Sequence, residues 1–258
     1  MKFKPILVFD FDGVIVDGLV EYWRSSREAC LEIIKNTQIT NDTLPLEIPD
    51  EFRKLRPWVK HGWEMVLIAA EILRADSLLK SNPNDFAKNY KKNRDQALNI
   101  WGWNPKQLQT ALDNVRKQAI SSNRQKWLAS HIAFSGITER IHQLENEGTD
   151  FGVLTTKSEV FTSELLTHLN LCPQVLYGYE SGKKPNLLLQ IAKERPIRGF
   201  IEDRRTTLET IINTPGLFSV PCYLATWGYL KPEDCENLPS KIRLLRPENL
   251  MSPLANWP

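Results

Sequence analysis

Two carboxylates at the end of an apolar run give this sequence its clearest chemical signature. The run Ile6–Phe9 is followed by Asp10, Phe11 and Asp12, and Gly13 comes directly after the second acid. Side chains two residues apart on an extended chain share a face, with Cα atoms about 6–7 Å apart. Asp10 and Asp12 can therefore address one reacting centre together, and the glycine lets the chain turn away sharply after them.

The apolar run must be the element that positions these acids. Four consecutive apolar residues, mostly branched or aromatic, are typical of a strand that is buried on both faces in a parallel sheet. Such a strand cannot bury free charges, so we expect the aspartates at its C-terminal mouth, where open α/β sheets bind their ligands.

Polar side chains recur where other elements end or begin. These are Thr155–Lys157 after the strand Phe151–Leu154, Glu202 and Asp203 after the strand Gly199–Ile201, and Lys183 and Lys184 before Pro185 at a helix start. Carboxylates gathered at one edge of a sheet are costly unless a cation compensates them. Mg²⁺ is the natural choice, because it takes oxygen ligands in an octahedral arrangement and keeps several waters.

The segment Asp-Phe-Asp-Gly-Val-Ile-Val-Asp, residues 10–17, resembles the first motif of the haloacid dehalogenase (HAD) superfamily, most of whose members are magnesium-dependent phosphatases. The resemblance implies that Asp10 attacks phosphorus and becomes an aspartyl-phosphate. It also implies that Asp12 is the general acid and base, and that Asp10 and the backbone carbonyl of Asp12 bind Mg²⁺. An ordinary strand followed by an Asx turn is the alternative for this stretch alone.

Two later motifs resemble the same family. Thr155 matches the hydroxyl that hydrogen-bonds a transferring phosphoryl oxygen, and Thr156 with Lys157 resembles the usual Asn-Lys pair, which can add backbone donors. A helix N-cap is the alternative for Thr155. The family pattern Lys-Pro selects Lys184 as the cation that lowers repulsion between Asp10 and the phosphate, with Lys183 as the alternate. A solvated basic turn is the alternative for both lysines.

The fourth motif resembles the version of the family with paired acids. We expect Asp203 to bind Mg²⁺ and Glu202 to be a second ligand, against the alternative that Asp203 caps the next helix. The sequence departs from versions with another acid four or five residues on, where Thr207 and Leu208 stand; Glu209 comes one position later.

Composition is that of an ordinary globular protein. The chain has 258 residues and a formal net charge of +2, so no global electrostatic effect favours nucleic acid or anionic membranes. No apolar run approaches the length of about 18–20 residues that a transmembrane helix needs. The four cysteines form no CxxC pair, which favours reduced thiols in an intracellular protein over a zinc site. The N-terminus leads straight into the strand, so we expect neither a signal peptide nor a transit segment, and a cytoplasmic location.

After residue 17 the pattern becomes helical for about a hundred residues, and then strands and helices alternate. We expect helices at Leu19–Lys35, Glu51–Leu73, Asp85–Trp101 and Lys106–Ser130, with a loop at 36–50, a break at 81–84, and Asn104 and Pro105 starting the last helix. The alternating part predicts strands at 151–154, 175–177, 199–201, 220–225 and 242–245, with helices at 137–147, 159–169, 186–194 and 206–212.

This order predicts an α/β fold: a Rossmann-like, mainly parallel sheet core, residues 1–17 and 131–258, with an inserted all-helical cap, residues 18–130. The resemblance implies that the insert is a cap of the C1 type and supplies substrate contacts. Its most concentrated polar and aromatic patch comprises Arg56, Trp58, Lys60, His61, Trp63 and Glu64. Arg56 or His61 can hold an anionic substrate. A helix with core tryptophans and a solvated face is the alternative, and the same holds for Arg24 and Arg27.

The sequence thus predicts a Mg²⁺-dependent phosphohydrolase that acts on a small phosphorylated metabolite. Asp12 separates it from the family's dehalogenases, which lack an aspartate there. Two alternatives stay open: a phosphomutase, which passes the phosphoryl group to a sugar hydroxyl, and a binding or scaffold protein that has lost turnover. The substrate and the oligomeric state are not predicted.

Overall fold

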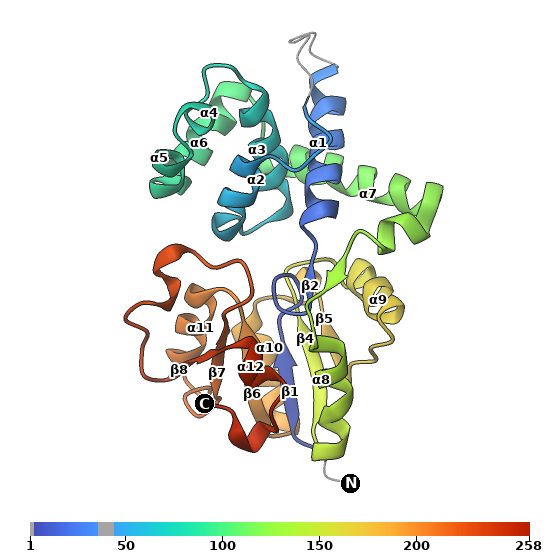
Figure 1. The fold of residues 1–258 in the computed structure, drawn as a ribbon, viewed down its shortest axis with the longest axis vertical. Helices are drawn as coiled ribbons and strands as arrows, with labels where there is room; N and C mark the ends of the chain where they lie inside the picture. Colours follow the sequence, from blue (N-terminus) through green and yellow to red (C-terminus); the bar gives the residue numbers. More distant parts are fainter. Residues whose placement is uncertain (1–2, 36–43) are drawn as a thin grey trace. The chain divides into compact units, whose positions relative to one another are not determined.

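A computed structural model describes residues 3–35 and 44–258 of the chain. The chain divides into two compact units. Residues 1–17 and 132–258 form an α/β unit, and residues 18–131 form a helical unit (Figure 1). The part of the predicted loop 36–50 that covers residues 36–43 lies outside the described residues.

The α/β unit is built on one parallel sheet. Within the described residues it has six strands in the order β5-β4-β1-β6-β7-β8, and every neighbouring pair is parallel. The strands are β1 (Ile6–Phe9), β4 (Asp150–Leu154), β5 (Val175–Tyr177), β6 (Ile197–Glu202), β7 (Cys222–Ala225) and β8 (Ile242–Leu245). The predicted fold class is confirmed.

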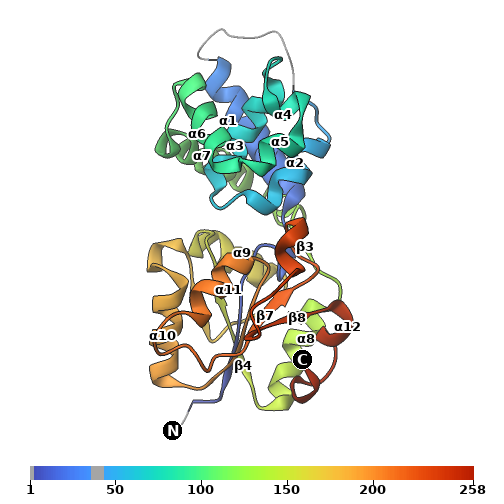
Figure 2. The same cartoon turned by 90° about the vertical axis from the view of Figure 1, so that its left-hand side faces the viewer.

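Strand β1 lies between β4 and β6 in the middle of this order, and all four of its side chains are completely buried. Helices cover both faces of the sheet, because side chains alternate along each strand and both faces of the central strands are apolar. Figure 2 shows α10 (Lys184–Glu194) and α11 (Arg205–Ile212) on one side and α8 (Ile137–Gln143) on the other. Ile6 and Val8 belong to the apolar cluster that β1 shares with α10 and α11.

The α/β unit contains further helices and 3₁₀ turns. They are the helices α9 (Glu159–His168) and α12 (Pro247–Leu250) and the 3₁₀ turns η2 (Leu144–Glu147), η3 (Tyr179–Ser181), η4 (Pro232–Cys235) and η5 (Leu254–Asn256). The predicted helix 137–147 is α8 followed by η2, and Gly148 ends it in the left-handed conformation at φ +64°, as expected of a helix terminus.

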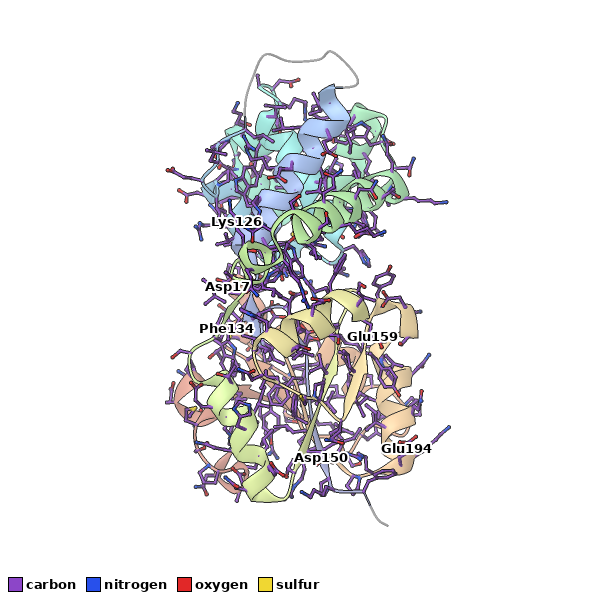
Figure 3. All side chains as sticks on the ribbon, turned by 90° about the vertical axis from the view of Figure 1, so that its right-hand side faces the viewer. Asp17, Lys126, Phe134, Asp150, Glu159 and Glu194 are labelled. Carbon is purple, nitrogen blue, oxygen red and sulfur yellow. The ribbon has the colours of Figure 1, made fainter. Side chains whose placement is uncertain are left out.

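A two-stranded antiparallel ribbon, which the sequence did not predict, carries the chain out of the α/β unit and back into it. Strand β2 (Val16–Asp17) pairs with β3 (Ile132–Ala133), and Phe134 N donates to Ile15 O at 3.0 Å. Asp17 and Phe134 lie at opposite ends of this ribbon (Figure 3). Two residues per strand are too few to leave a periodic pattern in the sequence.

The helical unit contains α1 (Leu19–Lys35), α2 (Asp50–Leu55), η1 (Arg56–Trp58), α3 (Gly62–Leu73), α4 (Leu78–Ser81), α5 (Pro83–Lys88), α6 (Tyr90–Trp101) and α7 (Pro105–Leu128). The bounds of α1 agree with the prediction. Asn104 caps α7, as predicted, and its side chain accepts from Gln107 N at 3.0 Å.

Three predicted helices are interrupted. The predicted helix 51–73 is divided into α2, η1 and α3, because Val59 and His61 are extended and Pro57 cannot donate a helical hydrogen bond. Asn89 separates α5 from α6, within the predicted helix 85–101. Asn123 leaves the helical conformation inside α7, and its side chain accepts from Lys126 N at 2.9 Å, which starts the helix again.

No helix in the described part of the chain combines the length and the apolar character that crossing a bilayer requires. All four cysteines lie in described segments and are free thiols, with Cys30 and Cys222 buried and Cys172 and Cys235 exposed.

Candidate active site

The sheet brings three of the four sequence motifs to the same edge. Phe9, the last residue of β1, is in register with Val153 of β4 on one side and Ile201 of β6 on the other. Asp10 continues β1 and donates its backbone N–H to Ile201 O at 2.8 Å. Because parallel strands end on the same side, the residues that follow β1, β4 and β6 all lie at one carboxyl edge.

Three acids form a buried cluster at this edge. One carboxylate oxygen from each of Asp10, Glu202 and Asp203 lies within 4.8 Å of the others, and these residues are exposed by only 6%, 2% and 4%. In the described residues no other group of His, Cys, Asp or Glu side chains meets this geometry. Like charges held this closely in an apolar surrounding repel one another unless a cation offsets them.

Lys184 supplies part of that compensation. It is the first residue of α10, and its Nζ donates to Asp10 Oδ1 at 2.5 Å and to Glu202 Oε2 at 2.7 Å. Burial alone would lower the pKa of the Lys184 ammonium, but the two carboxylates outweigh it and raise that pKa. The neighbouring Lys183 is exposed, so of the two predicted lysines Lys184 is the one that contacts the acids.

The same surroundings also raise the pKa values of Asp10 and Glu202, which favours the neutral form of these acids. Burial, and then the charge of Glu202, raises the pKa of Asp10 to about 7, although Lys184 works against the increase. The pKa of Glu202 is also raised, again mainly by burial and in part by Asp203, with Lys184 opposing. One lysine therefore does not balance the cluster.

A divalent cation fits this donor set. When ionised, the three carboxylates carry two more negative charges than the Lys184 ammonium offsets. All three offer oxygen atoms, which are the ligands that Mg²⁺ prefers. Both oxygens of Glu202 accept hydrogen bonds, Oε2 from Lys184 and Oε1 from Arg204 N at 3.1 Å.

Asp12 lies beside a second lysine. Lys157 Nζ is 3.4 Å from Asp12 Oδ1, and the lysine side chain is almost completely buried. The sequence motif predicts only a backbone donor at Lys157, because nothing in the motif indicates where a long side chain turns. Its backbone N–H donates to Thr155 Oγ1 at 3.0 Å, so the turn after β4 places the predicted hydroxyl and this lysine together.

Thr155 is held firmly at the end of β4. It is 4% exposed, and its backbone N–H donates to Tyr177 O on β5 at 3.0 Å. Thr156, the next residue, is exposed.

Arg56 and His61 belong to the helical unit. Arg56 is buried with its guanidinium 5.0 Å from the centre of the Tyr22 ring, and His61 is exposed at the start of α3. Their role in binding a substrate stays a prediction.

Asp203 has a close partner that the sequence did not indicate. The backbone N–H of Tyr229, in the turn that follows β7, donates to Asp203 Oδ2 at 2.8 Å. A strand-end acid is visible as a motif, whereas a backbone donor from a distant turn has no sequence signature.

Solved structures share this architecture over almost the whole chain. A predicted phosphatase from Clostridium acetobutylicum is 15% identical, with 94% of each chain covered and a TM-score of 0.57. A predicted phosphoglycolate phosphatase from Haemophilus somnus is also 15% identical, with 94% of each chain covered and a TM-score of 0.56. A hydrolase of the haloacid dehalogenase-like family from Streptococcus pneumoniae is 14% identical, covers 94% of this chain and 93% of its own, and has a TM-score of 0.53.

The chain has the fold of the HAD-like hydrolases. The resemblance of residues 10–17 to the HAD family is thus confirmed at the level of the fold. No family model matches the sequence, and no curated protein matches it. At these identities a shared HAD-like fold does not fix an activity, which depends on the residues at the carboxyl edge of the sheet.

Proposed function

We propose that the protein is a Mg²⁺-dependent phosphohydrolase that acts on a small phosphate monoester, with Asp10 as the nucleophile. The observation that carries the proposal is the buried cluster of Asp10, Glu202 and Asp203, the first two in contact with Lys184, at the edge of the sheet where open α/β sheets bind their ligands. Proteins described as phosphatases share the fold, which supports the same class of reaction.

Asp10 and Asp12 divide the chemistry into two steps. Asp10 attacks phosphorus, the bond from phosphorus to the ester oxygen breaks, and Asp12 gives its proton to the leaving oxygen. Water then attacks the phosphoryl group on Asp10, Asp12 takes a proton from that water, and the bond between phosphorus and Asp10 breaks. Inorganic phosphate leaves, and both aspartates return to their starting states.

The cations of the chain assist these steps. Lys184 contacts Asp10 directly and offsets the charge that would repel an incoming phosphate. Lys157 lies beside Asp12 and holds that side chain at the edge of the sheet. The Thr155 hydroxyl is a donor for a phosphoryl oxygen. A bound Mg²⁺ would be held by Asp10, Asp203 and the Asp12 carbonyl, with Glu202 beside them, and would neutralise charge on the phosphoryl oxygens.

The test is release of inorganic phosphate from a panel of phosphate monoesters, phosphoglycolate and sugar phosphates among them, with Mg²⁺ or with EDTA. We expect turnover that needs Mg²⁺ and that falls by about a thousandfold or more in Asp10→Asn, because the nucleophile is lost. Asp76→Asn is the matched control, since Asp76 is an exposed partner of Arg74 in the helical unit. Equal rates in wild type and Asp10→Asn would overturn the proposal, and transfer to a sugar hydroxyl would indicate a mutase.

A further inference from the structure

The turn Thr226–Tyr229, which follows β7, makes close contacts with Asp203 and with the segment after Asp12. From these contacts we infer that this turn positions Asp203 for metal binding, and that Tyr229 is its positioning residue. The inference rests on the proposed function, since it assigns a task to residues around the proposed metal site.

Hydrogen bonds from two residues of the turn reach the acid edge of the sheet and the segment after Asp12. Tyr229 donates its backbone N–H to Asp203 Oδ2 at 2.8 Å and its hydroxyl to Asp17 Oδ1 at 2.6 Å. Trp227 Nε1 donates to Val14 O at 3.0 Å. Tyr229 thus bridges a carboxylate of the proposed metal site and the end of the loop that begins at Asp12.

Two glycines allow this close approach. A Cβ atom at Gly13, which has a φ of +94°, would overlap Asp203 Oδ2. A Cβ atom at Gly228 would overlap the Asp203 Cβ atom and the Gly13 carbonyl oxygen. The Asp203 side chain therefore lies against glycine backbone from both segments, and little space is left for another rotamer.

The segment beyond the turn is tied back to the connection that carries Asp203. Arg205, the first residue of α11, donates to the carbonyl oxygens of Glu236 at 2.6 Å and Asn237 at 3.2 Å. Asp234 Oδ2 accepts from Lys231 N at 2.9 Å. Both ends of the segment 226–237 are thus anchored to the β6–α11 region, which suits it to hold a neighbouring side chain still.

A carboxylate that is held in one orientation binds a metal better than one that must first be ordered. Partners that orient a metal ligand typically change metal affinity by about 10–100-fold when they are removed. Loss of the hydrogen bond between the Tyr229 hydroxyl and Asp17 removes one restraint on the turn, but the bond from the Tyr229 backbone N–H to Asp203 remains. We therefore expect an effect at the lower end, about tenfold.

The test uses Mn²⁺ as the probe and measures its dissociation constant by isothermal titration on the full chain. Tyr229→Phe should weaken Mn²⁺ binding about tenfold and raise the KM for Mg²⁺ in phosphate release by a similar factor, while kcat at saturating Mg²⁺ changes less than about threefold. The matched control is Tyr177→Phe, which also removes one hydroxyl bond in the α/β unit, from Gln190 Nε2 at 3.2 Å.

A second pair of variants separates positioning from simple stability. Asp17→Asn keeps an acceptor for the Tyr229 hydroxyl and should bind Mn²⁺ as wild type does, whereas Asp17→Ala should reproduce the loss. If Tyr229→Phe and Asp17→Ala lower the melting temperature in EDTA but leave Mn²⁺ affinity at the wild-type value, the inference is wrong. If wild type itself binds no Mn²⁺ and releases no phosphate, the proposed function is what fails.

Discussion

Ionisation of Asp10 should destabilise the metal-free protein, and Asp10→Asn should remove that cost. Burial, and then Glu202, raises the pKa of Asp10 from its ordinary value of 3.8 to about 7, with Lys184 opposing. A group whose pKa is higher in the folded state holds its proton more tightly there. Its contribution to stability is therefore fully present at low pH and is lost as the pH rises through the window from about 4 to about 7.

The magnitude follows from the two pKa values. Each pKa unit corresponds to about 1.4 kcal/mol, so the complete loss above pH 7 is about 4 kcal/mol. Between pH 5 and pH 8 the change is about 3 kcal/mol, because part of the loss has already occurred at pH 5. Asparagine has nearly the same shape and does not titrate. The free energy of unfolding of Asp10→Asn should thus rise relative to wild type by about 3 kcal/mol over this interval.

This difference can be measured by urea unfolding in EDTA, with unfolding monitored by hydrogen exchange in peptides that cover β1 and β6. The peptide readout is needed because the two units need not unfold together. Adding Mg²⁺ at pH 8 should stabilise wild type more than Asp10→Asn, which has lost one charged ligand of the proposed site. If the free energy of unfolding in EDTA depends on pH in the same way for the two proteins, the reasoning is refuted. The pKa of Asp10 would then not be raised by the acid cluster.

Three further predictions concern the neighbours of Asp10. Lys184→Met should lower kcat/KM for phosphate release by about 10²–10³-fold, because Lys184 then no longer offsets the repulsion between Asp10 and the phosphate; a loss under threefold would contradict this. Asp203→Asn should weaken Mn²⁺ binding, measured by titration, at least about tenfold more than Glu202→Gln does, because both Glu202 oxygens already accept hydrogen bonds from the chain. A larger loss of Mn²⁺ affinity in Glu202→Gln would be evidence against Asp203 as the main ligand. Thr155→Ala should lower kcat about 10–100-fold in a phosphate-release assay, whereas Thr156→Ala should leave kcat within about twofold of wild type, because only Thr155 is buried at the site. Equal losses of kcat would contradict Thr155 as the donor to the phosphoryl group.

Matched controls exist for two of these changes. Lys183→Met alters the exposed lysine next to Lys184 and should leave kcat/KM within about twofold of wild type. Thr207→Ala alters a threonine of α11 where the paired-acid motif has no ligand, and it should leave both Mn²⁺ affinity and kcat unchanged within error.

The sheet could be predicted because its strands are buried on both faces. An apolar run such as Ile6–Phe9 needs no neighbours to be recognised, and the alternation of short strands with helices then fixes a parallel arrangement. The ends of long helices were predicted less well. The breaks at Val59 and Asn89 were missed because single residues with weak helix propensity are tolerated within helices, so propensity alone does not locate a break.

In the candidate site, the sequence predicted the residues that directly follow apolar strands more readily than the other residues. Acids and hydroxyls directly after apolar strands are visible in the sequence, and the structure places Asp10, Glu202 and Asp203 together. The position of the Lys157 ammonium and the bridge made by Tyr229 were missed. Both depend on where a side chain or a turn lies in three dimensions, far along the chain from its partner.

The most direct test of the central claim is to trap the phosphoryl group on the chain. Wild type and Asp12→Asn would be mixed with a phosphate monoester and Mg²⁺, quenched in acid and analysed by peptide mass spectrometry. We expect one phosphoryl group on Asp10, with more of it in Asp12→Asn when the ester has a leaving group that needs no proton, because that variant cannot activate the water of the second step. Phosphate release with no adduct on Asp10, or with the adduct on another residue, would contradict the account.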